Sequence, residues 1–348
     1  MNTLDQPILI TTSKEETCRA DMDDILRCSK SIMEALSSHG YRVEILNITP
    51  SDFWNLHGLV SRIRDTRPIC IFNLFEGFSN NPNLESKFAK ILETLGIPFT
   101  GNSSETLEKC LNKATTKKFL QSKNIKVPQG FATKKPLLKP PKGLDYPLFI
   151  KPCCEDGSLG IDCDSLVESE GELISKIEAK LLNHPAGIIV EEFIPGKEFN
   201  VGFLGNTNYE VLSVSYLDYS KHMGMGIHPF LSYSAKWDSD SLEFGINFKE
   251  LPTSERDLRE KIIGIGYKCG AALGCKGYFR VDIRERNGEL YVLDVNPNPD
   301  INIDSGFVRQ GKAAGYSYID LLKKIIDLAI EESAERSRYY EAQCLGVH

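Results

Sequence analysis

The sequence predicts an α/β chain in which a parallel sheet comes first and a mixed α+β region follows. Strand-like and helix-like patterns alternate along residues 1–101, a Pro- and Lys-rich stretch lies at 133–145, and mainly strand-like patterns come after it. Near the end, two strand patterns at 277–283 and 290–296 flank an Asn-Gly turn, which is a strong hairpin signal. These three observations indicate a helix-covered sheet, then a surface loop or linker, then a region with antiparallel strands.

In the first part, short apolar runs alternate with amphipathic stretches. This order is typical of a parallel sheet with helices on both faces. No GxGxxG follows the first strand, which disfavours a dinucleotide-binding site there. The expected strands are 7–11, 41–48, 68–74 and a short one at 97–100, and the expected helices are 21–38, 53–64 and 82–95.

The loop 75–82 follows the third strand, at the edge where open α/β sheets usually bind ligands. Glu76 in this loop either meets a substrate amine or caps the next helix. Both interpretations stay open on the sequence alone.

The later elements are a mixture of helices and strands. Residues 220–252 show no periodic pattern, and a loop of this length is usually functional or mobile. Capping boxes that begin at Ser254 and Ser317 predict the starts of the last two helices. The expected elements ahead of them are a helix at 114–123, a strand at 146–152, a helix at 170–182, a strand at 187–194 and further strands to 219.

The terminal hairpin carries four polar side chains inside apolar strands. A plain two-residue turn at Asn287-Gly288 would pair Asp282 with Leu293, whereas an odd-length loop, for instance a bulge with Gly288 in the left-handed region, pairs Asp282 with Asp294. On that register Arg280, Asp282, Asp294 and Asn296 share one face. Three oxygen donors at this spacing suit a hard divalent ion, and the guanidinium suits a phosphate or an oxyanion. The alternative is a solvated strand face with a salt bridge, which the apolar strands around these residues disfavour.

Two further segments point to phosphate and nucleotide. Lys151 ends a strand and precedes a loop with Gly157 and Ser158, whose backbone N–H groups could wrap a polyphosphate. This loop lacks the P-loop pattern, and its Asp-Gly-Ser run is also an ordinary turn signal. The segment 191–198 ends a strand in Pro-Gly, so its backbone could meet an adenine edge while Glu198 accepts from ribose hydroxyls.

Composition excludes several classes of function. The 348 residues are enough for two or three domains of roughly 150 residues each. The net charge of −7 argues against a general nucleic-acid surface, and no apolar run is long enough for a bilayer span. The N-terminus lacks a secretion signal, and the ten cysteines form no CxxC or zinc pattern, so we expect a cytoplasmic protein with reduced thiols.

Taken together, the motifs resemble those of the ATP-grasp superfamily, and within it the D-alanine–D-alanine ligase branch. The resemblance covers roughly residues 68–330, and the first sixty residues are similar only in layout. It implies an N-terminal parallel-sheet domain at 1–101, a central ATP-grasp subdomain at 102–186 and a C-terminal subdomain with the metal site at 187–340. The motifs that carry it are Lys113, Lys151 with its loop, 191–198, Arg280 with Asp282, and Asp294 with Asn296.

The resemblance also implies roles for single residues. ATP phosphates would be held by Lys113, Lys151, Gly157, Ser158 and Lys236, and the nucleoside by Glu191, Phe193, Ile194 and Glu198. The metal ligands would be Asp282, Asp294 and Asn296, for Mg²⁺ with Mn²⁺ as an alternative. Arg280, Lys236 and Ser158 would be the catalytic residues, and Glu76, Asp300 and Ser305 would contact the substrates.

Departures from the family pattern lie mainly on the amino-acid-binding side. Asp294 stands where the family usually has Glu, and Gly157 where the ligases have a first serine. Asp300 replaces the glycine after the Asn-x-x-Pro turn, and Glu76-Gly77 replaces a His-Gly. The early Gly-Gly with its substrate-binding glutamate is missing near 11–13. The resemblance therefore carries over the chemistry and leaves the substrate open.

We therefore expect an ATP- and Mg²⁺-dependent carboxylate–amine ligase that works through an acyl phosphate and releases ADP and phosphate. Its partners would be an amino acid and an acceptor acid, and a homodimer is the family-level expectation. The alternatives are an authentic D-alanine–D-alanine ligase, an amino-acid ligase of secondary metabolism such as the mycosporine type, and an inactive nucleotide-binding protein.

Overall fold

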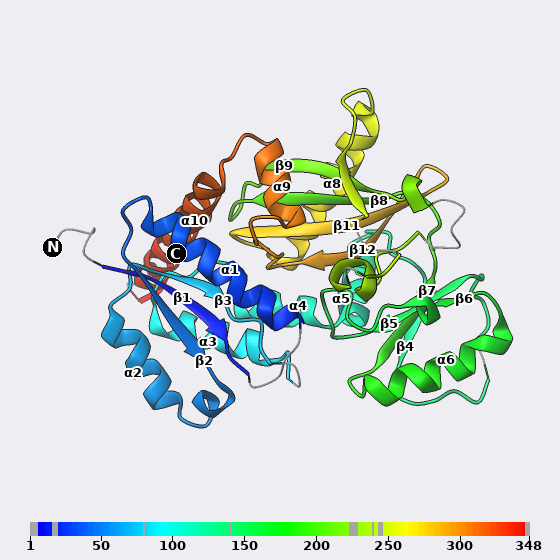
Figure 1. Cartoon of the computed structure of the whole chain (residues 1–348), viewed down its shortest axis with the longest axis horizontal. Helices are drawn as coiled ribbons and strands as arrows, with labels where there is room; N and C mark the ends of the chain where they lie inside the picture. Colours follow the sequence, from blue (N-terminus) through cyan, green and yellow to red (C-terminus); the bar gives the residue numbers. More distant parts are fainter. Residues whose placement is uncertain are drawn as a thin grey trace.

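The computed structural model describes residues 6–15, 20–78, 81–139, 141–222, 229–238, 240–242 and 246–344. Their strands form three sheets, which Figure 1 shows as an N-terminal sheet, a small central sheet and a larger C-terminal sheet. The last helix returns to the N-terminal sheet (Figure 1). No helix in the described ranges is both long and apolar enough to cross a bilayer.

The N-terminal sheet is parallel, in the order β2-β1-β3. All six residues of the central strand β1 are buried, as expected of a strand covered on both faces. One face packs on α1 and the last helix α10, and the opposite face on α2 and α3. The elements are β1 (Ile8–Ser13), α1 (Ala20–Ser37), β2 (Val43–Ile48), η2 (Pro50–Phe53), α2 (Leu56–Thr66), β3 (Cys70–Leu74), α3 (Leu84–Leu95) and α10 (Tyr318–Cys344).

The central sheet is antiparallel, in the order β4-β7-β5-β6. Helix α6 covers one face with Leu173 and Ile177. Phe149, Lys151 and Glu191 alternate with the residues of that core and lie on the opposite face. The elements from this part of the chain are α4 (Ser104–Leu111), α5 (Lys113–Ser122), β4 (Gly130–Thr133), β5 (Leu148–Pro152), η3 (Cys163–Ser165), β6 (Leu166–Val167), α6 (Glu170–Asn183) and β7 (Ile188–Glu192).

The C-terminal sheet is antiparallel, in the order β10-β9-β8-β11-β12. Helix α8 lies against one face so closely that a Cβ on Gly270 would stand 2.3 Å from the Phe279 ring. Helix α9 lies on the other face, over β8 and β9. The elements are β8 (Glu198–Leu204), β9 (Glu210–Asp218), η4 (Ser220–His222), α7 (Tyr233–Trp237), β10 (Asn247–Glu250), α8 (Arg256–Leu273), β11 (Tyr278–Arg286), β12 (Glu289–Asn296) and α9 (Gly306–Ala313).

The hairpin between β11 and β12 reaches the predicted register by a different route. Asn287 and Gly288 both have positive φ, of 55° and 79°, so the loop is the plain two-residue turn and not an odd-length one. The extra residue lies within the ladder instead, since Asp282 pairs with Asp294 and Ile283 with Val292. Leu293 is therefore the extra residue of a β-bulge, and it lines the main cavity.

Several other expectations need correction. The strand expected at 97–100 is only a single bridge from Phe99 to Ile71. Helix α4 was missed, and the described part of 220–252 contains η4, α7 and β10. Ser254 does not cap α8, because Glu255 is the N-cap residue and makes no side-chain cap bond. The cap at Ser317 is confirmed by its hydrogen bond from Asp320 N, at 3.2 Å.

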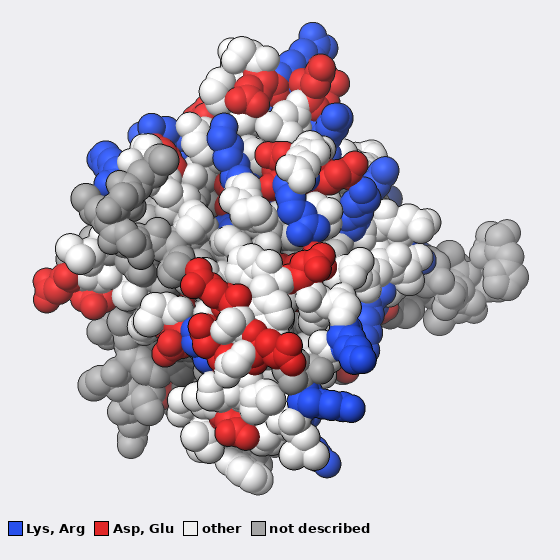
Figure 2. Space-filling view, turned by 90° about the vertical axis from the view of Figure 1, so that its right-hand side faces the viewer, with Lys and Arg blue, Asp and Glu red and all other residues white. Residues whose placement is uncertain are grey.

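Charge is mixed over the surface. Figure 2 shows Lys and Arg side chains beside Asp and Glu side chains on one face of the molecule. The described residues of that face therefore form no continuous basic surface, in keeping with the net charge of −7.

The turn at Gly288 yields a first prediction. Replacement Gly288→Ala should lower the free energy of unfolding by about 1 kcal/mol, because an L-residue in the left-handed region clashes with its own backbone. The matched control is Gly264→Ala in α8, where a Cβ would meet nothing within 4 Å and the helix should gain up to about 1 kcal/mol. Urea unfolding measures both. Equal stability of Gly288→Ala and the unaltered protein would contradict the turn assignment.

Candidate active site

One cavity of about 710 Å³ lies between the three sheets. It is large enough for a nucleotide together with small substrates. All residues that the sequence singled out line this cavity, so the structure brings them together. They are Glu76, Lys113, Lys151, Gly157, Ser158, Glu191, Phe193, Ile194, Glu198, Lys236, Arg280, Asp282, Asp294, Asn296, Asp300 and Ser305.

The hairpin face converges as predicted. Arg280 donates to both oxygens of Asp282, from Nε at 2.7 Å and from Nη2 at 2.8 Å. Asn296 Nδ2 donates to Asp282 Oδ2 at 3.0 Å, and Asn200 Nδ2 from β8 donates to Oδ1 at 2.6 Å. Asn200 was missed by sequence reasoning because its approach depends on the pairing of β8 with β11.

The residues of this face fit a hard cation that arrives with phosphates. Asp282 and Asp294 are cross-strand partners, and Asn296 follows on the same face, giving two carboxylates and one amide oxygen. No cluster of three or more His, Cys, Asp or Glu side chains forms a ready metal cage in the described ranges. Mg²⁺ commonly takes only one or two protein carboxylates and fills its shell with water and phosphate oxygens. The donor set therefore suits a metal–nucleotide complex.

Lysines lie beside these carboxylates. Lys113 Nζ is 3.0 Å from Asp294 Oδ2 and 2.8 Å from Asp156 Oδ1 in the glycine loop. Burial opposes the charge on Lys113, but Asp156 and Asp294 outweigh it and raise its pKa. The pKa of Asp294 is lowered, since Lys113 and Lys151 outweigh the effect of burial. Both groups are therefore charged at neutral pH.

Glu191, Lys151 and Lys117 form a buried charged triad beside the part of the cavity where phosphates would bind, which is called the phosphate end below. Glu191, whose exposed fraction is 2%, pairs with Lys151 at 3.0 Å and also with Lys117. Lys151 Nζ also reaches the carbonyl of the bulged Leu293, at 3.5 Å. Burial lowers the pKa of Lys117 to about 8, because the negative charge of Glu191 offsets only part of the cost of burial. Lys117 was missed, although its position four residues after Lys113 places both on one face of α5.

The glycine loop has the backbone shape expected of an anion-binding turn. Gly157 and Ser158 both have positive φ, of 62° and 66°. The loop is closed by Leu159 N donating to Asp156 O and Ile161 N donating to Ser158 O, each at 3.0 Å. Successive residues in such conformations can turn their N–H groups toward a phosphate.

Lys236, on the short helix α7, also lines the cavity. The helix begins at Ser232, whose side chain accepts from Ala235 N at 3.0 Å. Unlike Lys113 and Lys151, Lys236 has no ion-pair partner in the described part of the chain. Burial, and then the charge of Arg280, lowers the pKa of Lys236 to about 8. An anion at this point would raise the pKa of Lys236 again.

An aromatic group lines the cavity next to the end of β7. Phe149 and Phe193 are 6.0 Å apart between ring centroids, and Phe230 packs edge-on at 5.0 Å from Phe149. The Ile194 N–H has no hydrogen-bond partner within the described ranges. A flat apolar slot with a free donor at its edge suits a purine base.

The remaining wall of the cavity is acidic. Asp300 accepts from Asn302 N at 2.8 Å, and Asn302 Nδ2 donates to Asp24 Oδ1 of α1 at 2.8 Å. Burial, together with the charge of Asp24, raises the pKa of Asp300. Ser305 caps α9, since its oxygen accepts from Val308 N at 3.2 Å, so its expected role as a substrate contact has a structural function beside it.

Glu85 and Asp24 also line this wall and were missed, because each looks like an ordinary solvated residue in a first helical turn. Glu85 Oε1 accepts from Asn298 Nδ2 at 3.0 Å. Burial, with a contribution from Asp156, raises the pKa of Glu85 to about 8. Asn298 in turn accepts from Asn102 N at 3.0 Å and so joins the C-terminal strands to the N-terminal part.

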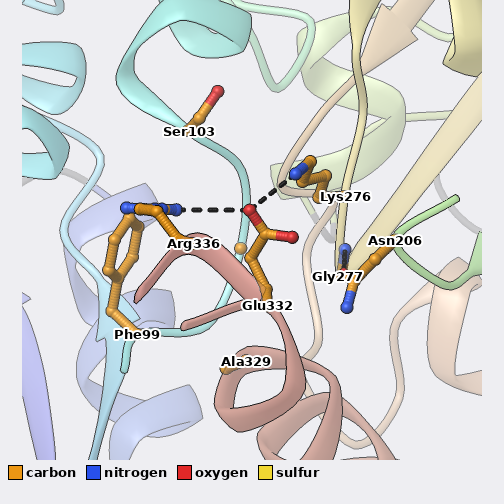
Figure 3. A pocket seen from close by; sticks show the side chains of 9 residues that line it. Phe99, Ser103, Asn206, Lys276, Gly277, Ala329, Glu332 and Arg336 are labelled. Atoms are coloured by element: carbon orange, nitrogen blue, oxygen red, sulfur yellow. Dashed lines mark hydrogen bonds and ion pairs between the residues drawn. The ribbon is translucent and has the colours of Figure 1, made fainter. Parts of the chain in front are cut away.

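A second pocket lies where Glu332 of α10 contacts Lys276 and Arg336 (Figure 3). Its volume of about 10 Å³ holds roughly one water molecule. This pocket is therefore part of the packing of α10 and too small for a substrate.

Comparisons with known proteins agree with this geometry. The profile of the family described as D-ala D-ala ligase C-terminus matches residues 122–327. A D-alanine–D-alanine ligase of Carboxydothermus hydrogenoformans is 34% identical over 251 residues, which are 69% of this chain and 76% of that protein. A D-alanine–D-alanine ligase of Moorella thermoacetica is 28% identical over 316 residues, which are 88% and 94% of the two chains.

Solved structures give the same fold. The crystal structure of the D-alanine–D-alanine ligase from Bacillus anthracis superposes with a TM-score of 0.73, covering 95% of this chain and 99% of that chain at 21% identity. The ATP-grasp fold expected from the motifs is thereby confirmed.

The raised pKa of Glu85 yields a prediction for stability. Folding raises the pKa of this carboxyl from 4.5 to about 8. Its protonation therefore stabilises the folded state fully below pH 4.5, and this stabilisation is lost as the pH rises through about 8. The melting temperature should therefore fall less between pH 5 and pH 9 in Glu85→Gln, which keeps the acceptor for Asn298. The control is Glu34→Gln, on a side chain that is 64% exposed. Parallel pH profiles for Glu85→Gln and the unaltered protein would refute the assignment.

Proposed function

Because the chain belongs to the D-alanine–D-alanine ligase family of ATP-grasp enzymes, we propose that it joins the amine of an amino acid to a carboxylate that ATP has activated. An ADP-forming C–N ligase is the general activity of this chain. The observation that supports the proposed amino acid–carboxylate ligation is that a phosphate end, a metal-binding face and an acidic wall meet in one cavity.

Two steps account for the reaction. An oxygen of the acceptor carboxylate attacks the γ-phosphorus of ATP, the bond to the β-γ bridging oxygen breaks, and ADP leaves. The amine, after losing a proton, then attacks the carbonyl carbon of the acyl phosphate. The tetrahedral intermediate collapses to the amide and releases inorganic phosphate.

The residues of the chain position the reactants and balance their charge. Lys113 and Lys151 lie where the phosphates of ATP would meet the glycine loop, and Lys236 faces them. Arg280 lies between the hairpin carboxylate and Asp300, where it could stabilise an oxyanion. A divalent ion, for which we propose Mg²⁺, would be held by Asp282, Asp294 and Asn296 and would neutralise charge on the transferred phosphoryl group.

The acidic wall supports a substrate with a free ammonium group. Asp24, Glu76 and Asp300 line the cavity beside the carboxyl of Glu85, and the lining also includes Arg27, which pairs with Asp24, and Arg309. Such a wall favours a cation over the carboxylate of a small neutral amino acid. This distinguishes the proposal from D-alanine–D-alanine ligation, which the names of the relatives favour and which we keep as the second candidate.

Amine-dependent ADP release tests the function. The purified protein is incubated with ATP, Mg²⁺ and pooled amino acids, and the pools that release ADP are resolved into pairs. We expect turnover with a pair that contains an amino acid with an additional ammonium group. Release with D-alanine alone would establish the second candidate, and no release with any pool would contradict the proposed function.

The same assay tests the hairpin face. Asp294→Asn keeps the size of the side chain but removes its charge, and it should lower kcat by about 100-fold, because a displacement of about 1 Å at the reacting groups already costs this much. Asp164→Asn, on the exposed η3, is the matched control and should leave kcat unchanged. Wild-type turnover by Asp294→Asn would remove this residue from the metal site.

A further inference from the structure

Arg284 of β11 is buried in the cavity wall, with 3% of its side chain exposed, although the chemistry proposed above does not use it. Its neighbours two residues away are Asp282 toward the phosphate end and Arg286 toward the turn. Burial of an arginine is costly unless its donors find acceptors. The contacts of this side chain therefore show what holds it in the wall.

The guanidinium joins three separate segments of the cavity wall. Nε donates to Glu198 Oε2 at 3.0 Å, and Nη2 lies 2.9 Å from the same oxygen in an ion pair. Nη1 donates to the carbonyl oxygen of Ile194 at 2.9 Å. Nη2 also donates to the carbonyl oxygen of Pro229, which begins the described segment that continues into α7 and Lys236.

Arg284 also lies over an aromatic ring. Its guanidinium carbon is 4.9 Å from the centroid of Phe193. This cation–π contact helps to hold the guanidinium in place. A lysine at this position could not reproduce that set of bonds, because its single ammonium group cannot reach three acceptors in one plane.

These contacts change what the Ile194 peptide offers to a base. Its carbonyl oxygen accepts from Arg284, whereas its N–H has no partner within the described ranges. The Ile194 backbone therefore presents a donor to the cavity, and Arg284 already takes one of the two lone pairs of its carbonyl oxygen. N1 of adenine is an acceptor and pairs with such a donor. In the same pose guanine would set its N1–H donor against the Ile194 N–H donor, and its N1–H and 2-amino group would compete with Arg284 for the carbonyl oxygen.

We propose that Arg284 is a positioning and specificity-determining residue, which holds Glu198 for the ribose and selects adenine over guanine through the Ile194 peptide. This inference rests on the nucleotide site of the proposed function and adds a base preference to it. A merely structural role for Arg284 would give a different result, since loss of stability would weaken the binding of both nucleotides alike.

Nucleotide binding, measured by isothermal titration calorimetry with MgATP and MgGTP, tests this proposal without turnover. The unaltered protein should bind ATP more tightly than GTP. In Arg284→Met, ATP affinity should fall about 10- to 100-fold, the usual effect of removing hydrogen bonds to a charged group, while GTP affinity falls less or rises. Arg284→Lys keeps the charge opposite Glu198 and should recover part of the ATP affinity but not the base preference.

The matched control is Arg286→Met. Arg286 lies on the same strand as Arg284 and pairs with Glu192 of β7 at 3.2 Å, but it does not line the cavity. Its loss should therefore leave the ratio of the ATP and GTP dissociation constants unchanged. Thermal melts verify that each variant is folded. If Arg284→Met does not fold, Arg284→Lys alone is used to measure the base preference.

Each outcome supports or overturns the inference. Equal affinity of the unaltered protein for ATP and GTP overturns it before any variant is made. An unchanged ratio in Arg284→Met and Arg284→Lys overturns it while leaving the proposed function intact. If the unaltered protein binds neither nucleotide, the nucleotide site fails and the proposed function fails with it.

Discussion

The site depends on one irregularity in the β11–β12 ladder, the insertion of Leu293 between residues that pair. Without the bulge, the tight turn at Asn287-Gly288 would set Asp282 opposite Leu293 and turn Asp294 to the core. With it, Asp282 and Asp294 become partners and face the cavity. The bulge also brings the Leu293 carbonyl to within 3.5 Å of Lys151 Nζ, and so connects the hairpin to the central sheet. One local kink therefore sets both the ligand face and its distance from the phosphate end.

Charge compensation keeps the cavity folded in the absence of a ligand. Asp294 pairs with Lys113, Asp282 with Arg280, and the fully enclosed Glu191 with two lysines. Buried charges are tolerated only when they are paired, and each of these groups is held in place by a neighbour of opposite sign. A metal–nucleotide complex can exchange with these partners, because its phosphates replace the carboxylates and its cation replaces the lysines. The same pairs thus serve folding and binding.

The sequence predicted the elements whose burial follows a local period, and it predicted the convergence of Arg280, Asp282, Asp294 and Asn296 from the hairpin alone. It could not place the bulge, because the alternation of side chains between the two faces requires one extra residue in the hairpin but does not fix its position. Lys117, Glu85 and Arg284 were missed for a related reason. Each has an unremarkable local pattern, and its role comes from partners that are 74, 213 and 90 positions away in the chain. The short helix α7 was missed because its residues carry no helical period of apolar side chains.

The most direct test of this account is the position of a divalent ion in the assembled site. A crystal grown with Mn²⁺ and a non-hydrolysable ATP analogue would locate the ion through its anomalous signal. The account predicts a peak coordinated by oxygens of Asp294 and Asn296 and by phosphate oxygens, with Asp282 on the same side. A bound nucleotide whose ion lies away from the hairpin, or has no hairpin ligand, would contradict the claim that the bulged hairpin is the metal-binding face.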